Sequence, residues 1–199
     1  MKKFVLDKCM SIIKENTQYN DTKLEEIRYG LEGIYLTITK TIIISIICIL
    51  IGIFKEFLIF LIIYSIMRTP SFGIHASKSW ICLIISSVTF IGFPLLSIYT
   101  NLNIITKLVL GIISIIGICI FSPADTVKRP IINKKRRRIY KIISTTIASI
   151  YIIVSLKIKN NFIANCLIYS TILQNIVISP LTYKLFKMPY NNYKKYGLN

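Results

Sequence analysis

The residues best suited to chemistry lie between positions 68 and 82, where the only histidine of the chain, His75, precedes Cys82 by seven residues. A cysteine attacks a carbonyl carbon as a thiolate, and an imidazole is the side chain that most often takes the thiol proton and returns it to a leaving amine. Either residue alone in an apolar run is usually a packing residue. The pair therefore predicts a cysteine nucleophile with a histidine as its general base.

The two side chains can meet only if the backbone bends between them. In one straight helix they would share a face but stand about 10 Å apart along the axis, which is too far for proton transfer. Pro70 and Gly73 interrupt any helix before His75, and the sustained apolar run begins only at Trp80. We therefore expect His75 to lie on a loop that leads into a helix.

Cys82 is expected near the N-terminus of that helix. Ser77 or Ser79 is suited to be its N-cap, because a hydroxyl oxygen accepts hydrogen bonds from the unpaired N–H groups of a first turn. The positive end of the helix dipole favours a thiolate there, and the same N–H groups could bind the oxyanion of a tetrahedral intermediate.

These residues resemble the accessory gene regulator B (AgrB) family of membrane peptidases, which process the propeptides of cyclic quorum-sensing signals. A second match follows at residues 122–126, at residues 129–131 and in the basic run after them. The order of segments also fits along nearly the whole chain. The residues of the first match, at the spacing of the family, are Arg68, Gly73, His75, Ala76 and Cys82.

The resemblance implies a cysteine endopeptidase that needs no cofactor. Cys82 would attack a peptide carbonyl of an AgrD-like propeptide, His75 would relay the proton to the departing amine, and an acyl-enzyme thioester would result. The acyl group would then pass to a Cys or Ser side chain of the same peptide and give a cyclic thiolactone or lactone. The family also suggests a homodimer.

Three further residues could support this chemistry. Gly73 belongs to the matching motif, and Arg68 could either snorkel to the membrane interface or bind a substrate carboxylate or the oxyanion. Asp125 stands out because acidic residues are scarce in the second part of the chain. It could hold the tautomer of His75, or it could cap a turn or pair with Arg129.

The composition predicts a membrane protein. Of the 199 residues 54% are hydrophobic, and the mean hydropathy of +0.64 is well above that of soluble domains. The net charge of +17 does not indicate nucleic-acid binding, because the basic residues lie between apolar runs. The five cysteines include no CxxC pair, and with one histidine they predict no metal site. The polar first thirty residues are unlike a cleavable signal peptide.

The apolar runs predict an all-α membrane fold with about six transmembrane helices. Residues 1–35 predict amphipathic helices at the membrane surface, either as anchors or as a docking surface for an amphipathic peptide. Residues 36–181 are the expected transmembrane peptidase domain, with loops at 68–79 and 122–138, and residues 182–199 are a tail. The expected spans are two within 36–67 that meet near Lys55-Glu56, then 80–99, 104–121, 139–156 and 162–181.

The basic residues predict the sidedness of these spans. In the six-span order, twenty-one of the 25 Lys and Arg residues fall on one side of the membrane, the side of the N-terminus. The positive-inside rule makes this side cytoplasmic. Both termini and the His75–Cys82 site of a bacterial cell-membrane protein would then face the cytoplasm. The basic run at 134–138 is expected to bind anionic lipids.

A small transporter, a pore or a noncatalytic scaffold is the alternative function for such a chain. A transport pathway usually carries an ionisable residue within a span, whereas no acidic residue lies inside the spans expected here. Neither alternative needs a nucleophile. An activity that is lost on Cys82→Ala with expression intact would therefore favour the peptidase.

Overall fold

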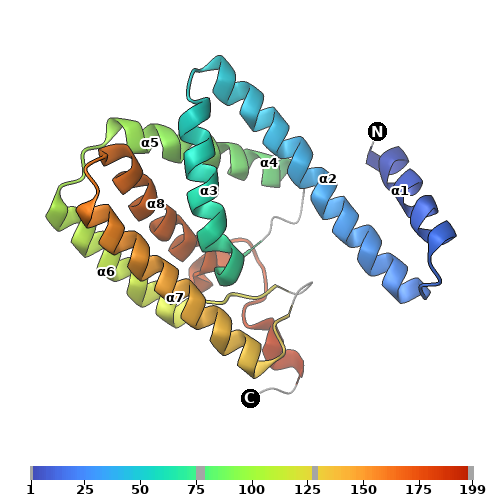
Figure 1. The fold of residues 1–199 in the computed structure, drawn as a ribbon. Coiled ribbons are helices and arrows are strands. Elements are labelled where there is room, and N and C mark those ends of the chain that lie inside the picture. The colour runs from blue at the N-terminus through green and yellow to red at the C-terminus, as the bar shows by residue number, and fades with distance from the viewer. Residues whose placement is uncertain (1, 75–78, 127–129, 197–199) are drawn as a thin grey trace. The chain divides into compact units, whose positions relative to one another are not determined.

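The computed structural model describes residues 2–74, 79–126 and 130–196, and it is helical almost throughout (Figure 1). These residues form no β-strand, so the prediction of an all-α fold is confirmed. By their internal contacts, residues 1–50 and residues 51–199 form two compact units.

The first unit consists of α1 (Lys2–Asn16) and α2 (Asp21–Leu50). Leu6 and Met10 of α1 are buried, and the Arg28 side chain of α2 donates a hydrogen bond of 3.0 Å to the Asp7 carboxylate of α1. The side chain of Asn20 caps α2 by accepting from the backbone N–H of Lys23 at 3.0 Å. From there α2 runs for 30 residues without a break, so the expected second amphipathic helix and the first expected span form one helix.

The second unit holds the remaining helices, with α8 (Asn161–Ile178) at its centre. Residues 164–171 of α8 are all buried, and α8 packs against α3, α5, α6 and α7. The other elements are α3 (Phe54–Ser71), α4 (Ser79–Ser87), a π-helical turn (Val88–Gly92), α5 (Phe93–Tyr99), α6 (Ile104–Phe121), α7 (Lys134–Lys157), α9 (Pro180–Leu185) and a 3₁₀ turn (Asn192–Tyr196).

Five helical segments are long and apolar enough to cross a membrane: 21–50, 80–99, 104–121, 134–157 and 161–178. The remaining expected span is α3, an 18-residue helix that carries Lys55, Glu56 and Arg68. The turn before it lies at residues 51–53, where Gly52 has a positive φ of 76°, just ahead of the predicted position. The prediction of a polytopic membrane protein with about six spans is thus confirmed.

Local capping explains where two spans differ from their expected limits. The helix α7 begins at Lys134 rather than near 139, because the Asn133 side chain accepts from the backbone N–H of Arg136 at 3.1 Å. The helix α8 ends at Ile178 rather than near 181, because Pro180 forces the residue before it, Ser179, into an extended conformation.

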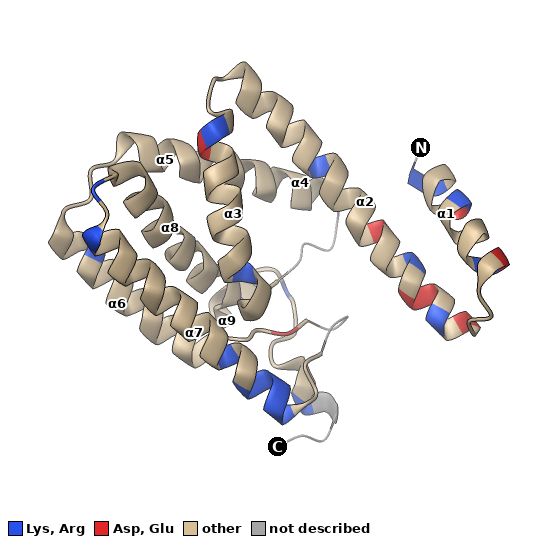
Figure 2. Ribbon diagram, in the orientation of Figure 1, with Lys and Arg blue, Asp and Glu red and all other residues tan. Residues whose placement is uncertain are grey.

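The loop residues 72–74 and 122–126 meet at one end of the second unit, together with the start of α7 and the end of α8. Basic residues gather at the start of α7, as Figure 2 shows. At the opposite end of α8, the Asn165 amide donates to the backbone carbonyls of Ser97 and Thr100. The two loops that were predicted to be cytoplasmic therefore lie at the same end of the bundle. That this end faces the cytoplasm stays a prediction.

Candidate active site

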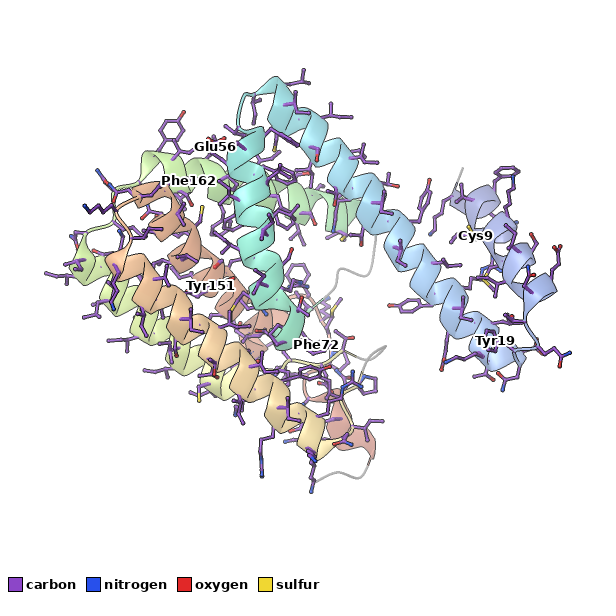
Figure 3. All side chains as sticks on the ribbon, viewed as in Figure 1. Cys9, Tyr19, Glu56, Phe72, Tyr151 and Phe162 are labelled. Atoms are coloured by element: carbon purple, nitrogen blue, oxygen red, sulfur yellow. The ribbon has the colours of Figure 1, made fainter. Side chains whose placement is uncertain are left out.

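A short parallel bridge fixes the chain just before His75. The backbone N–H of Gly73 donates to the carbonyl of Ala124 at 2.9 Å, and the N–H of Ala124 donates to the carbonyl of Ser71 at 3.1 Å. The side chain of Gln174, from α8, donates to the carbonyl of Phe72 at 2.9 Å. The 71–73 segment is thus bound to the loop after α6 and to the central helix. Figure 3 shows Phe72 just beyond the end of α3.

Glycine is required at position 73 for two independent reasons. Its φ of +118° lies in a region that residues with a Cβ rarely adopt. A Cβ atom built there would stand 2.7 Å from Cγ1 of Val177 in α8, well inside van der Waals contact. The glycine of the matching motif therefore lets the loop approach the central helix closely.

Arg68 binds the loop backbone directly ahead of His75. Its Nη2 group donates to the carbonyl oxygen of Ile74 at 2.8 Å, and its Nη1 group donates to the hydroxyl of Tyr64 at 3.1 Å. Both roles considered for Arg68 from the sequence, snorkelling and substrate binding, left out this internal contact. The bond fixes the carbonyl of the residue that precedes the histidine.

Asp125 is buried, at 2% exposure, and its carboxylate accepts three backbone N–H groups. The donors are Ile131 at 3.4 Å, Asn192 at 3.1 Å and Tyr193 at 2.8 Å. The bond from Ile131 agrees with the expectation of a turn cap, whereas the two bonds from the C-terminal segment were not predicted. A carboxylate that accepts several N–H groups joins the loop after α6 to the end of the chain.

The same C-terminal segment is held by aromatic residues. The hydroxyl of Tyr183, in α9, donates to the backbone carbonyl of Asp125 at 3.0 Å, and its ring centroid lies 5.0 Å from that of Tyr190. Burial, together with the Asp125 carboxylate, raises the pKa of the Tyr183 hydroxyl. The Arg137 guanidinium lies 3.6 Å from the ring centroid of Tyr193, a cation–π contact.

Cys82 is the fourth described residue of α4 and is half-buried. Its place in a first helical turn stays a prediction, because residues 75–78 lie outside the described residues. Ser79 belongs to the helix itself. His75 and Ser77 lie outside the described residues, as do Ala76 and the whole of 127–129. The pairing of His75 with Cys82 and the contact of Asp125 with Arg129 therefore stay predictions.

The continuous helical segment 79–99, which carries Cys82, packs against α3, which carries Arg68. In the π-helical turn, the ring of Phe90 lies 5.9 Å from the ring of Tyr64, edge to face, and 6.3 Å from the ring of Phe60. Tyr64 in turn accepts the hydrogen bond from Arg68. A chain of contacts thus connects the helical segment of Cys82, the candidate nucleophile, with the backbone next to His75, the candidate base.

Gln174 and the C-terminal residues Asn192 and Tyr193 were not predicted as part of the site. The only sequence signal for Gln174 is an amide in the middle of an apolar run, since a polar group in a span needs a partner inside the protein. Its Oε1 atom is buried and has no hydrogen-bond partner in the described part of the chain. No local pattern marks Asn192 or Tyr193.

The chain is similar to several known proteins. The chain is 26% identical to an AgrB-like protein of Clostridium acetobutylicum, over 98% of the chain and 95% of the relative. It is 30% identical to an AgrB-like protein of Listeria innocua, over 93% of the chain and 91% of the relative. It is 33% identical to the accessory gene regulator protein B of Staphylococcus carnosus, over 69% and 71%. No solved structure matches the chain.

A model of one protein family also matches, over residues 6–178, and it is described as accessory gene regulator B. The match includes α3, the bridge at Phe72, α4 and the loop that contains Asp125. The chain therefore belongs to the accessory gene regulator B family, which gives it a role in the processing of quorum-sensing signals.

Proposed function

We propose that this protein is a membrane cysteine endopeptidase that cleaves an AgrD-like propeptide and cyclises the product. The observation that carries the proposal is the construction of the loop ahead of His75. Arg68 binds Ile74, Gln174 binds Phe72, and Ala124 binds Gly73. A histidine that serves as a general base must be held in place in this way, whereas a transporter or scaffold has no need of it.

In the first step His75 takes the proton of the Cys82 thiol, and the thiolate sulfur bonds to the carbonyl carbon of the cleaved peptide bond. The N–H groups of the first turn of α4 are suited to bind the oxyanion. The carbon–nitrogen bond then breaks, and the imidazolium gives its proton to the departing amine. The N-terminal part of the propeptide remains attached to Cys82 as a thioester, and the C-terminal part leaves as the amine.

In the second step a Cys or Ser side chain of the attached peptide gives its proton to His75 and attacks the thioester carbonyl. The bond to Cys82 breaks, the thiolate recovers the proton, and a thiolactone or lactone leaves. Exchange of one thioester for another is nearly isoenergetic. A site with little water favours this transfer over hydrolysis.

Three residues have positioning roles in this proposal. Arg68 and Gly73 set the backbone of the loop, and Asp125 joins the neighbouring loop to the C-terminal segment. The three N–H groups that Asp125 accepts fill three of the about four acceptor sites of a carboxylate, which favours this role over the orientation of His75.

The surroundings of the enzyme follow from its charge. We place both termini and the active site in the cytoplasm, where the basic run at 134–138 binds anionic lipids and attracts the acidic tail of the propeptide. The working unit is a homodimer, as the family suggests. We expect no nucleic-acid partner, because the basic residues of the sequence lie between its apolar runs.

The test uses purified protein in proteoliposomes and an AgrD-like propeptide as the substrate. Cys82→Ala and His75→Ala should each abolish cleavage, because the chain has no second imidazole. The matched control is Cys119→Ala, which removes an exposed thiol from α6 and should leave cleavage unchanged. Substantial cleavage by either site variant would refute the peptidase and favour a noncatalytic function.

A further inference from the structure

A cavity of about 490 Å³ adjoins the loop that leads to His75. One wall is Phe72, and the other walls come from the segment between the loop after α6 and the second turn of α7. Its size is within the range of about 300–1,000 Å³ that is typical of ligand pockets. Phe72 precedes His75 by three residues, a length of chain that spans at most about 11 Å.

The walls of this cavity are held in place by contacts that need no ligand. The rings of Phe72 and Tyr140 meet edge to face, with centroids 5.1 Å apart. The hydroxyl of Tyr140 accepts from Nε of Arg136 at 3.0 Å and from Nη2 at 2.9 Å. The backbone N–H of Ile131, on another wall, donates to buried Asp125. A preformed pocket loses little entropy on binding.

The cavity combines apolar walls with one cation. Phe72, Ile131 and Ile132 give it apolar surface, and Arg136 stands at the same cavity. Arg136 uses two of its five N–H bonds on Tyr140, so that three remain for a ligand among the described contacts. Such a pocket fits a bulky apolar side chain that has a carboxylate close to it.

We propose that this cavity is the subsite for the propeptide residues next to the cleaved bond. An apolar substrate side chain packs against Phe72 and Ile131, and Arg136 binds the carboxylate of a neighbouring substrate residue. This inference rests on the proposed function, because it takes the propeptide as the ligand. It assigns Phe72, Arg136 and Tyr140 to substrate selection rather than to the reaction.

Site-specific cross-linking tests the location of the substrate. In the Cys82→Ala variant, which leaves the propeptide intact, Ile132 is replaced with the photoreactive residue p-benzoylphenylalanine. The matched control carries the same residue at Ile142, which also lies on an exposed face but does not line the cavity. We expect position 132 to cross-link the propeptide within about three residues of the cleavage site. Links only to lipid, or no more than at position 142, would overturn the subsite.

A charge exchange tests the part played by Arg136. Because a hydrogen bond between charged groups is strong, Arg136→Glu should raise KM by roughly 10- to 100-fold while kcat changes little. A propeptide whose acidic residue nearest the cleavage site is replaced with Lys should restore KM for this variant. The control Arg138→Glu makes the same charge change on α7 outside the cavity, and the Lys propeptide should not rescue it.

The outcomes separate the two proposals. If the wild-type protein cleaves the propeptide and Arg136→Glu behaves like Arg138→Glu with both peptides, the subsite is wrong and the peptidase stands. If the wild-type protein cleaves neither peptide, the proposed function is wrong, and the subsite falls with it.

Discussion

Replacement of Gly73 with alanine should disable the enzyme while leaving the fold intact. The new methyl group would need a backbone φ of +118° and would stand 2.7 Å from Cγ1 of Val177. The φ alone costs on the order of 1–3 kcal/mol for a residue with a Cβ. The overlap with Val177 adds roughly 1–3 kcal/mol if nothing moves.

We expect the loop in this variant to shift away from its native position, because shifting costs less free energy than keeping the full strain. Gly73 is held by one backbone hydrogen bond to Ala124, worth about 0.5–1.5 kcal/mol, and the carbonyl of its neighbour Phe72 accepts one bond from Gln174. Giving up these bonds costs less than the full strain. The free energy of unfolding should therefore fall by only about 1–3 kcal/mol, whereas a loop displaced by that energy reduces the active population by roughly 5- to 150-fold.

Three variants measured by propeptide cleavage in proteoliposomes distinguish the causes. Val177→Ala alone should have little effect, because Val177 is only partly buried. The double variant Gly73→Ala, Val177→Ala should recover the part due to the overlap but not the part due to φ. Gly30→Ala is the control, since a Cβ at this helical glycine meets no atom within 4 Å. Cleavage by Gly73→Ala within twofold of the wild type would refute the reasoning.

Four other predictions concern the site and its setting. Asp125→Asn should expose the C-terminal segment to limited proteolysis, because the variant loses the negative charge that binds the N–H groups of Asn192 and Tyr193. If the variant instead loses propeptide cleavage while the segment stays protected from proteolysis, a contact of Asp125 with His75 is favoured. Gln174→Leu should lower kcat at least fivefold with helix content unchanged by circular dichroism, and wild-type kcat would exclude a positioning role. A propeptide that lacks its internal nucleophile should leave a hydroxylamine-sensitive adduct on Cys82 in mass spectra, and only a linear product from an intact propeptide would refute cyclisation. Single cysteines placed at the expected outer positions, Thr100 and Asn160, should react with an impermeant thiol reagent on intact cells, whereas those at the inner positions, Ser77 and Asn133, should not. The opposite labelling pattern would refute the topology.

The helices were predictable where the sequence marks both of their ends. The span α6 has the expected limits, 104–121, because Asn103 caps its start and a polar loop with a proline follows it. The π-helical turn at 88–92 was not expected. Pro94 offers a reason for it, since a proline has no N–H for the carbonyl four residues earlier and its ring crowds that carbonyl.

The site was predictable only in its local part. Short motifs singled out Gly73 and Cys82, and the structure places the glycine at a positive φ and the cysteine in α4. Gln174, the partner of Phe72, lies 102 residues further along the chain. Asn192, a partner of Asp125, lies 67 residues further along. Their pairing depends on how the helices pack, and one sequence carries no signal for it. Arg68 was predicted as a site residue, but not its bond to the Ile74 carbonyl.

The bonds from Asn192 and Tyr193 to Asp125 also bear on biosynthesis. The ribosome makes the histidine loop and the nucleophile long before it makes the segment that closes over Asp125. A nascent chain whose early helices are already inserted in the membrane therefore lacks a finished site. Under the proposed function, a chain that ends before residue 192 should therefore be inactive towards a propeptide that is already present at the membrane.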